Sequence, residues 1–282
     1  MRDMNGKVVI VTGANSGIGK ITARELAEMG ATVIMVARSE SRGNAALAKV
    51  KAAIGRSDNV SLMLCDLSSQ ASIRAFVEQF KAKYDRLDVL VNNAGVMFMD
   101  RQESADGYEM TFALNHMGYF LLTDLLLDLL KASGNSRIVN VSSDAHRVGA
   151  VNFDDLQRHQ KYSGMKVYGE SKLMNILYTI ELARRLGETA VTVNALHPGV
   201  VRTNFGRNNS GFIGKILVPI FQRFAISADK GAETSIYLAA SDEVEGVSGK
   251  YFVKKKSVQA NAPAYDEVAQ KQLWSVSEAA LK

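Results

Sequence analysis

The chain has 282 residues, of which 47% are hydrophobic and 22% charged, and this is the composition of a globular protein long enough to bury one large core. Its formal net charge of +5 comes from basic residues interleaved with acidic ones, a pattern that argues against a nucleic-acid partner. The single cysteine, Cys65, excludes an internal disulfide and a zinc site built from cysteines, and it fits a reducing compartment.

The first predicted strand begins near Lys7, almost at the start of the chain. We therefore expect no signal peptide and no membrane anchor. The longest apolar stretch, residues 119–130, is interrupted by Asp124 and Asp128 and falls short of the ~20 apolar residues that a spanning helix needs. A soluble, cytoplasmic protein is expected.

Seven short runs rich in β-branched residues recur along the chain, and each is followed by a stretch with helical spacing of apolar residues. The runs are Val8–Val11, Thr32–Val36, Val60–Leu64, Val89–Val91, Ile138–Val141, Val191–Ala195 and Tyr251–Val253. Their near-continuous apolar character indicates strands buried on both faces. The pattern predicts a single-domain α/β chain over residues 1–282: a doubly wound Rossmann fold with a seven-stranded parallel sheet and helices on both faces. Ligands of such folds bind beyond the carboxyl ends of the strands.

The first predicted strand runs directly into a glycine-rich turn, and a helix pattern follows. The turn reads Thr12-Gly13-Ala14-Asn15-Ser16-Gly17-Ile18-Gly19. Glycine is needed where the backbone turns tightly and approaches a phosphate, and a helix N-terminus offers free N–H groups to an anion. The turn is therefore predicted to bind the pyrophosphate of a dinucleotide.

The end of the second predicted strand indicates which dinucleotide is preferred. A carboxylate at this place would bond the ribose 2′-hydroxyl and repel a 2′-phosphate. This chain has Ala37 followed by Arg38. Because a guanidinium forms charge-assisted and often bidentate hydrogen bonds with phosphate, we predict NADP (NADPH) as the cofactor, with NAD less favoured.

Tyr168 and Lys172 are four residues apart on a helix predicted to begin near Lys166, so their side chains share one face. A free tyrosine has a pKa of about 10 and is a poor base at neutral pH. A nearby ammonium and a cationic nicotinamide would both favour the phenolate, and a pKa near 7 requires about 4 kcal/mol of such stabilisation. Tyr168 is the predicted acid/base.

These motifs, together with several others, resemble the short-chain dehydrogenase/reductase family. The matches run in family order from residue 12 to residue 199, and the order of elements is similar over nearly the whole chain. They are Thr12-Gly13-x-x-x-Gly17-Ile18-Gly19, Asp66-Leu67, Asn92-Asn93-Ala94-Gly95, Asn115, Ser142-Ser143, Tyr168-x-x-x-Lys172 and His197-Pro198-Gly199. The resemblance implies an enzyme that moves a hydride between NADP(H) and a carbonyl or alcohol carbon.

The resemblance also assigns catalytic roles. It implies that Ser143 donates a hydrogen bond to the substrate oxygen and that Lys172 bonds the nicotinamide ribose. Asn115, within a helix predicted over Met110–Leu130, resembles a residue whose local distortion of the helix holds a water in a proton relay. An ordinary buried helix asparagine is the alternative for Asn115.

The cofactor contacts implied by the resemblance complete the predicted site. Asp66 and Leu67 correspond to adenine contacts, although a helix N-cap is a second interpretation of Asp66. The predicted cofactor-binding residues are Thr12, Gly13, Asn15, Ser16, Gly17, Ile18, Gly19, Arg38, Asp66, Leu67, Asn93, Ala94, Gly95, Tyr168, Lys172, Pro198, Gly199 and Thr203. The four histidines have no metal-site spacing, and no metal is expected.

Residues 204–227 are rich in large apolar side chains, and in this family the region folds over the active site as a lid. An apolar lid favours a lipophilic substrate. Core packing or an oligomer contact is the alternative, which leaves a homo-oligomer open. The chain from about residue 255 to residue 282 is interpreted as a C-terminal tail, and the lysine run that begins at Lys254 as a solvated strand end.

Within the family, four features look most like the retinol-dehydrogenase-like branch and its WW-domain relatives. They are Arg38, the long insert after Ser143, His197-Pro198-Gly199 and Leu273-Trp274. An aldehyde, ketone or secondary alcohol is the expected substrate class. Two rivals remain: an extended-type sugar-nucleotide epimerase or dehydratase, which has a different glycine spacing, and a non-enzymatic NADPH-binding regulatory protein, which would lack part of the catalytic set.

Overall fold

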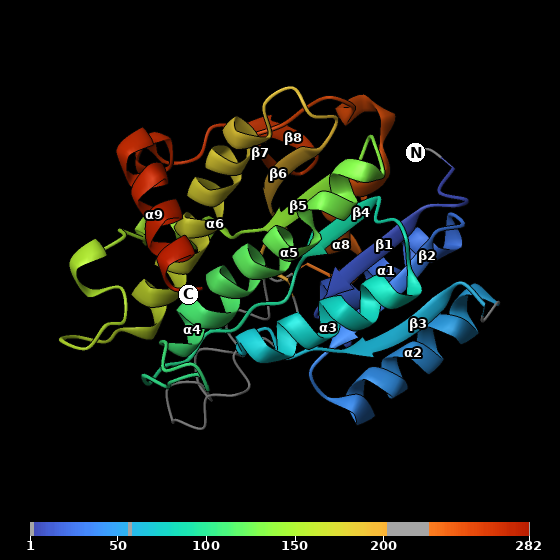
Figure 1. The fold of residues 1–282 in the computed structure, drawn as a ribbon, viewed down its shortest axis with the longest axis horizontal. Helices are drawn as coiled ribbons and strands as arrows, with labels where there is room; N and C mark the ends of the chain where they lie inside the picture. Colours follow the sequence, from blue (N-terminus) through green and yellow to red (C-terminus); the bar gives the residue numbers. More distant parts are fainter. Residues whose placement is uncertain (1–2, 56–57, 202–225, 282) are drawn as a thin grey trace.

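The computed structural model describes residues 3–55, 58–201 and 226–281. Within these residues one twisted eight-stranded sheet lies between two layers of helices (Figure 1), in the order β3-β2-β1-β4-β5-β6-β7-β8. The strands are β1 (Val8–Thr12), β2 (Thr32–Ala37), β3 (Val60–Leu64), β4 (Val89–Asn92), β5 (Arg137–Val141), β6 (Thr192–His197), β7 (Tyr251–Val253) and β8 (Lys256–Val258). The strand order reverses between β1 and β4, which is where a doubly wound sheet opens a crevice for ligands.

The helices connect these strands as the alternating pattern predicts. The α-helices are α1 (Gly17–Glu28), α2 (Glu40–Ile54), α3 (Gln70–Lys83), α4 (Met110–Phe112), α5 (Gly118–Ala132), α6 (Gly164–Leu186), α8 (Ala228–Ala240) and α9 (Glu267–Ala279). A π-helical turn, η1 (Ala113–Met117), joins α4 to α5. Short 3-10 turns occur at η2 (Asp144–Val148), η3 (Phe153–Asp155), η4 (Asp242–Val244) and η5 (Ala262–Tyr265).

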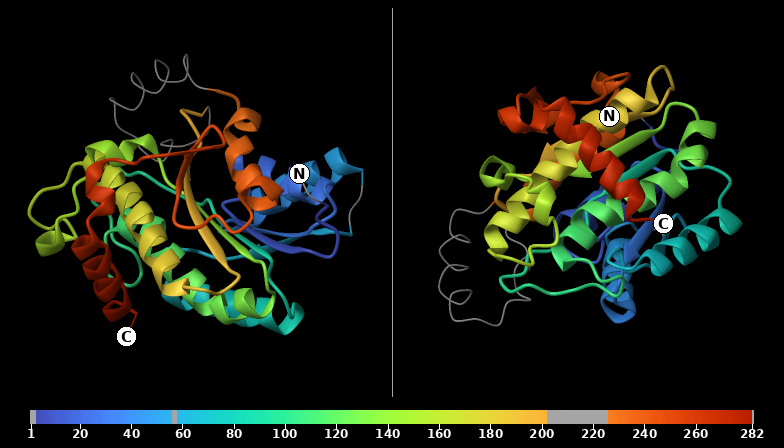
Figure 2. Two further views of the ribbon diagram at one scale, coloured as in Figure 1. Left: turned by 90° about the horizontal axis from the view of Figure 1, so that it is seen from above. Right: turned by 60° about the vertical axis from the view of Figure 1, so that its left-hand side comes forward.

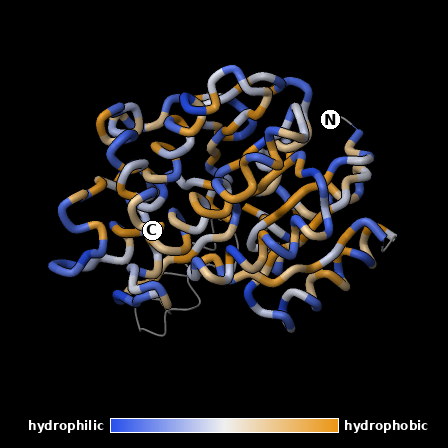
Figure 3. The backbone as a smooth tube through the Cα atoms, viewed as in Figure 1, coloured by the Kyte–Doolittle hydropathy of each residue, from blue (hydrophilic) through white to orange (hydrophobic). Residues whose placement is uncertain are grey.

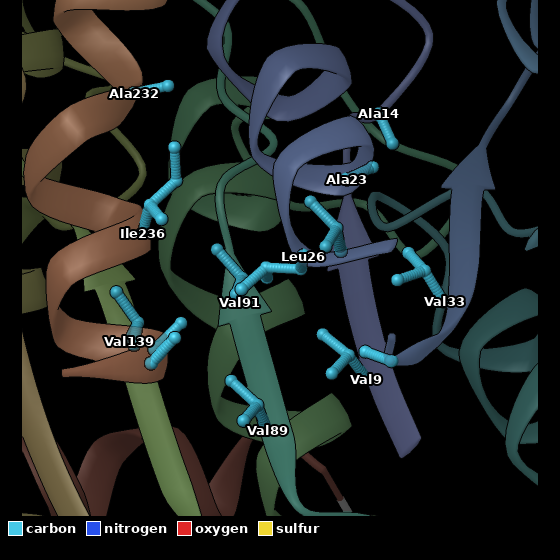
Figure 4. Close-up of a cluster of buried hydrophobic side chains, with 14 of the residues drawn as sticks. Val9, Ala14, Ala23, Leu26, Val33, Val89, Val91, Val139, Ala232 and Ile236 are labelled. Atoms are coloured by element: carbon cyan, nitrogen blue, oxygen red, sulfur yellow. The ribbon is translucent and has the colours of Figure 1, made fainter. Parts of the chain in front are cut away.

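Two apolar layers hold the sheet between its helices, because alternate residues of each strand point to opposite faces. Val9 of β1 packs in the layer under α1, α2 and α8, whereas its neighbour Ile10 packs in the layer under α3, α5 and α6. Figure 4 shows the first layer, with Leu26 of α1 and Ile236 of α8 meeting the valines of the strands. The two helix layers are separated by the sheet in Figure 2, and the strands form the apolar centre of the chain in Figure 3.

All seven predicted strands are present and parallel, and the sheet has one strand more than predicted. The additional strand, β8, pairs antiparallel with β7. The sequence carries little signal for it, because β8 is three exposed residues long and the hairpin turn uses Lys254 and Lys255 with φ of 49° and 64° instead of glycine or asparagine. The lysine run, interpreted as a solvated strand end, is therefore the turn of a hairpin.

A ladder of buried polar side chains fixes α6 against the sheet. Asn92 Nδ2 donates to Thr123 Oγ1 at 3.1 Å and to Asn140 Oδ1 at 2.9 Å. Asn140 Nδ2 in turn donates to Thr179 Oγ1 of α6 at 2.9 Å. Buried polar groups are costly unless paired, so this chain of hydrogen bonds favours one register of α6 over others.

The segment interpreted as a tail contains β8, η5 and the helix α9, and α9 packs against α6 (Figure 2). Trp274 of α9 is the centre of this contact. Its ring lies 4.9 Å from that of Phe120 and 5.9 Å from that of Tyr178, and the Arg185 guanidinium lies 4.1 Å from its centroid. The C-terminal segment is thus part of the folded core around α6.

Candidate active site

The ends of β1 and β4 are joined through the side chain of Thr12. Its Oγ1, fully buried, donates to the carbonyl of Val91 at 3.2 Å and accepts from the N–H groups of Asn93 at 2.8 Å and Ala94 at 3.1 Å. Asn93 Nδ2 returns a bond to the carbonyl of Thr12 at 2.8 Å. The Thr12 side chain therefore holds the end of β1 against the end of β4, and it does not point into the crevice between the two strands.

The glycine-rich turn leaves no room for side chains at two of its three glycines. Gly13 has φ of 66°, and a Cβ on it would lie 2.8 Å from the Cα of Ala94. A Cβ on Gly19 would lie 2.4 Å from Asn93 Nδ2 and 2.6 Å from the carbonyl oxygen of Gly13. Gly17 begins α1 with φ of 54°. These glycines bring the first turn of α1 against the strand ends.

The same turn fits the pyrophosphate of a dinucleotide. Ser16 is the N-cap residue of α1, and its side chain makes no capping hydrogen bond. Asn15, Ser16 and Ile18 are partly exposed around the helix N-terminus. No side chain caps the first helical turn, so its backbone N–H groups remain for the anion that the sequence predicts here.

Arg38 and Asp66 face each other across the ends of β2 and β3. The Arg38 guanidinium is 3.7 Å from Asp66 Oδ2, and both side chains remain partly or largely exposed. Asp66 Oδ1 accepts from the N–H and the hydroxyl of Ser68, while Ser69 caps α3. The N-cap interpretation of Asp66 is therefore wrong. Leu67 is 5% exposed and packs in the core layer.

Asn115 lies in the π-helical turn η1, where the sequence predicts a continuous helix with a local distortion. Its Oδ1 accepts from the N–H of Val96 at 2.8 Å, and its Nδ2 donates to the carbonyl of Val96 at 2.9 Å and to Ser171 Oγ at 3.0 Å. The distortion thus turns Asn115 towards the segment that follows β4, at Val96, and towards α6. Ser171 Oγ also donates to the carbonyl of Tyr168 at 2.8 Å.

Tyr168 and Lys172 lie one helical turn apart on α6, which begins two residues before the predicted start. Lys172 Nζ, on a side chain 2% exposed, donates to the carbonyl of Val141 at 3.0 Å and lies 5.6 Å from the centroid of the Tyr168 ring. Burial lowers the pKa of the Lys172 ammonium to about 7. Burial also raises the pKa of the Tyr168 phenol to about 12, and a hydrogen bond with Ser143 opposes that rise.

Ser143 follows β5 and begins a tight turn. It is the N-cap residue of η2, and its Oγ accepts from the N–H of Ala145 at 3.2 Å. The preceding Ser142 has a different place, because its Oγ donates to the backbone carbonyl of Lys172 at 2.7 Å. The structure therefore brings Ser143, and not Ser142, to the Tyr168 hydroxyl.

The turn after β6 contains Pro198 and Gly199. Gly199 has φ of 92°, and a Cβ on it would lie 2.8 Å from Cδ1 of Ile226. Thr203 and most of the predicted lid, residues 204–225, lie outside the described residues. In the part of the chain that is described, no three His, Cys, Asp or Glu side chains gather as a metal site would require.

Two polar side chains near the site are absent from the predicted set. Tyr119 donates its hydroxyl to the carbonyl of Ala94 at 2.7 Å, and its ring centroid lies 5.8 Å from Lys172 Nζ. Ser171 bridges Asn115 to α6 as described above. Tyr119 follows Asn115 by four residues and Ser171 follows Tyr168 by three, so helical spacing alone places each on the face of its neighbour.

The site therefore places a phenol, an ammonium, a hydroxyl and an amide together at the carboxyl ends of β4 and β5, beside the first turns of α6. A partly protonated lysine beside a phenol, with a serine hydroxyl bonded to that phenol, is suited to proton transfer at an oxygen atom. The glycine turn and Arg38 are suited to phosphate groups. The arrangement can bind a dinucleotide and move a proton next to it.

Comparison with known proteins shows the family of this chain. Residues 7–211 match the family model of the short chain dehydrogenases. Retinol dehydrogenase 14 of Homo sapiens is 47% identical, with 98% of this chain and 86% of the relative covered. Retinol dehydrogenase 12 of Mus musculus is 44% identical, with 96% of this chain and 85% of the relative covered.

Solved structures agree with the sequence relatives. An uncharacterized protein from Mycobacterium paratuberculosis has a TM-score of 0.81 at 33% identity, with 100% of this chain and 95% of the other covered. A short chain dehydrogenase from Burkholderia cenocepacia, solved in complex with NADP, has a TM-score of 0.69 at 26% identity, with 89% and 97% covered. This chain belongs to the short chain dehydrogenase family and is an NAD(P)-dependent oxidoreductase.

Proposed function

We propose that this enzyme transfers a hydride between NADP(H) and a lipophilic aldehyde, ketone or alcohol, with Tyr168 as the acid/base. The observation that carries the proposal is the meeting of Tyr168, Ser143, Lys172 and Asn115 beside the glycine turn. Four polar groups from three separate parts of the chain converge where a doubly wound fold binds its ligands.

The proposed step at the substrate oxygen follows from the pKa values. Burial raises the pKa of the Tyr168 phenol to about 12, so the phenol carries its proton at neutral pH. The glycine turn and Arg38 would hold NADPH, which would supply the hydride. Tyr168 then gives its proton to the oxygen of the carbonyl being reduced, and Ser143 donates a hydrogen bond to the same oxygen. In this protonation state the phenol can act as the acid in carbonyl reduction.

Lys172 and Asn115 serve the proton supply in this proposal. Burial lowers the pKa of the Lys172 ammonium to about 7, which is near the optimum for a group that gives and takes a proton at neutral pH. Asn115 holds the backbone of Val96 and the hydroxyl of Ser171 next to the pair. It is proposed to support the water through which Lys172 exchanges its proton with solvent.

NADP is preferred over NAD in the proposal because Arg38 stands at the end of β2. Its guanidinium is largely exposed and is 3.7 Å from Asp66, so it has charge available for a 2′-phosphate. Complexes with NADP among the solved relatives support this choice.

A lipophilic substrate is supported by the relatives and by exposed apolar residues close in sequence to the site residues. The sequence relatives are retinol dehydrogenases. Val148, Met165 and Val200 expose 63%, 48% and 55% of their surface, and each lies within six residues of a proposed site residue. Exposed apolar side chains that neighbour site residues along the chain are consistent with an apolar ligand. Among the helices described, none is long and apolar enough to cross a membrane; the cytoplasmic location stays a prediction.

The test is a screen of purified enzyme with NADPH against a panel of aldehydes and ketones of increasing chain length, retinal included. The consumption of NADPH is followed by its absorbance, and NADP with the matching alcohols gives the reverse direction. Turnover that rises with apolar chain length, and that NADH supports at least about tenfold less well, is expected. Binding of NADPH without turnover of any carbonyl would favour a regulatory NADPH-binding protein instead.

A further inference from the structure

The turn that carries Ser143 is held by two histidines that the proposed mechanism does not use. We call residues 143–149 the serine turn. His197, at the end of β6, accepts a hydrogen bond at Nδ1 from the N–H of Asp144 at 3.0 Å. His146, within the turn, has Nδ1 at 2.7 Å from the carbonyl oxygen of Ser143. The two imidazoles thus bind the backbone on both sides of the Ser143–Asp144 peptide.

The bonding partners fix the protonation state of both rings. A backbone N–H can only donate, so Nδ1 of His197 carries no proton and Nε2 carries it in the neutral ring. A carbonyl oxygen can only accept, so Nδ1 of His146 carries its proton. Nε2 of His146 accepts from the N–H of Asn261 at 3.3 Å, so Nε2 carries no proton. Both rings are neutral, in opposite tautomers.

The serine turn is also pressed against the helix that carries Tyr168. A Cβ on Gly149 would lie 2.5 Å from the carbonyl oxygen of Gly169, and a Cβ on Gly169 would lie 2.7 Å from that of Ala145. Gly169 directly follows Tyr168. The turn therefore has α6 on one side, β6 on another and the C-terminal segment at Asn261 on a third, and the distance from Ser143 to Tyr168 depends on all three.

We propose that His146 and His197 are positioning residues that hold Ser143 in place for the substrate oxygen, and that they do so only while both rings are neutral. The proposal rests on the role of Ser143 in the proposed function. Protonation of His197 would set an N–H against the N–H of Asp144, and protonation of His146 would do the same against Asn261. Acid would therefore release the turn.

The surroundings keep both rings neutral near pH 7. Asp144, Arg147 and the histidines themselves are the charged or titratable groups around the pair, and the ring of Tyr251 lies 5.1 Å from that of His146. Burial is the largest effect and lowers the pKa of both imidazoles, against the attraction of Asp144. Arg147 bonds the Asp144 carboxylate at 2.6 Å and so weakens that attraction.

The first experiment observes the rings directly, without turnover. Nitrogen-15 NMR of histidine-labelled protein at neutral pH distinguishes the two neutral tautomers. We expect the Nδ1–H form for His146 and the Nε2–H form for His197. A doubly protonated ring at either position, or the reverse tautomers, would overturn the proposal.

The second experiment measures catalysis in matched variants. His197→Phe and His146→Phe remove the bonds, and kcat is expected to fall about tenfold or more because a small displacement at a reacting oxygen is costly. His197→Gln keeps an acceptor that does not titrate, so it should recover part of kcat. Its activity relative to the unaltered enzyme should rise as the pH falls from 8 to 5. His159→Gln, at an exposed histidine of the insert, should match the unaltered enzyme at every pH.

Two further results separate this inference from the proposed function. Ser143→Ala should be nearly inactive, and full activity in that variant would mean that the proposed function is wrong. An inactive Ser143→Ala together with unchanged kcat in both phenylalanine variants would overturn only the positioning role. If the phenylalanine variants do not fold, the pH dependence of His197→Gln decides, since a ratio that stays flat with pH contradicts the proposal.

Discussion

The cofactor side and the catalytic side of this site are built in different ways. Around the turn between β1 and α1, the shape comes from backbone: Gly13 and Gly19 permit contacts that any Cβ would block. Around η1, η2 and α6, the shape comes from buried polar side chains that bond to backbone over long sequence distances, such as Asn115 to Val96 and Lys172 to Val141. A backbone-built site is sensitive to added volume, whereas a site built from buried polar groups is sensitive to lost partners and to pH.

The largest effect is expected on the catalytic side, where one hydroxyl carries the chemistry. Tyr168→Phe keeps the ring and removes the proton donor, so turnover should fall by about 10²-fold or more. NADPH binding, measured by fluorescence titration, should stay within about twofold because the glycine turn is untouched. A variant that keeps more than about a tenth of the activity would show that the acid lies elsewhere.

The matching change on the cofactor side adds one methyl group. Gly19→Ala places a Cβ 2.6 Å from the carbonyl oxygen of Gly13, and the turn must open to admit it. NADPH affinity should fall by about tenfold or more, with a smaller effect on kcat at saturating NADPH. Gly43→Ala on α2 is the control, because its Cβ would meet only the side chain of Leu62 within 3 Å. Equal losses in the two variants would point to general destabilisation.

Substitutions of Arg38 should lower the preference for NADPH over NADH, with a smaller effect than the two variants above. Arg38→Gln removes the positive charge, and the ratio of NADPH to NADH affinity should fall by about tenfold. Arg38→Asp should remove most of what remains, because the new carboxylate would repel both the 2′-phosphate and the neighbouring Asp66. Equal affinities for the two cofactors in the unaltered enzyme would contradict this assignment.

The smallest effect concerns stability and again belongs to the catalytic side. His116, next to Asn115, is fully buried and bonds Ser277 of α9 at 2.8 Å, and burial lowers its pKa to about 3. Between pH 6.5 and 5.5 the His116 imidazole becomes protonated in the unfolded chain but stays neutral in the folded chain. The free energy of unfolding should therefore fall by about 1 kcal/mol over this range. Urea unfolding across this range checks the slope. His116→Asn should give a flatter pH dependence, and an unchanged slope would assign the acid sensitivity to other groups.

The strand, turn and helix of the cofactor side are also the structure that the sequence predicts best. The glycine turn is local, since strand, turn and helix N-terminus follow one another within about a dozen residues, and all seven parallel strands follow from their apolar runs. The catalytic side needs partners from far along the chain. Nothing near His146 in sequence indicates that Asn261 bonds it, and nothing in the lysine run indicates a hairpin. The sequence also does not indicate the packing of α9. Trp274 is a single aromatic residue in a polar segment, and its contact with Tyr178 of α6 is visible only in the folded structure.

The most direct test of the account follows the hydride itself. NADPH deuterated on the transferring face of nicotinamide C4 is given to the enzyme with an aldehyde that the screen has identified, and the alcohol product is analysed by mass spectrometry and NMR. The account predicts one deuterium on the carbinol carbon of the product, and about 10²-fold less labelled product from Tyr168→Phe over the same time. A product whose carbinol hydrogen comes from elsewhere, or deuterium that stays on the cofactor during turnover, would contradict direct hydride transfer to the substrate.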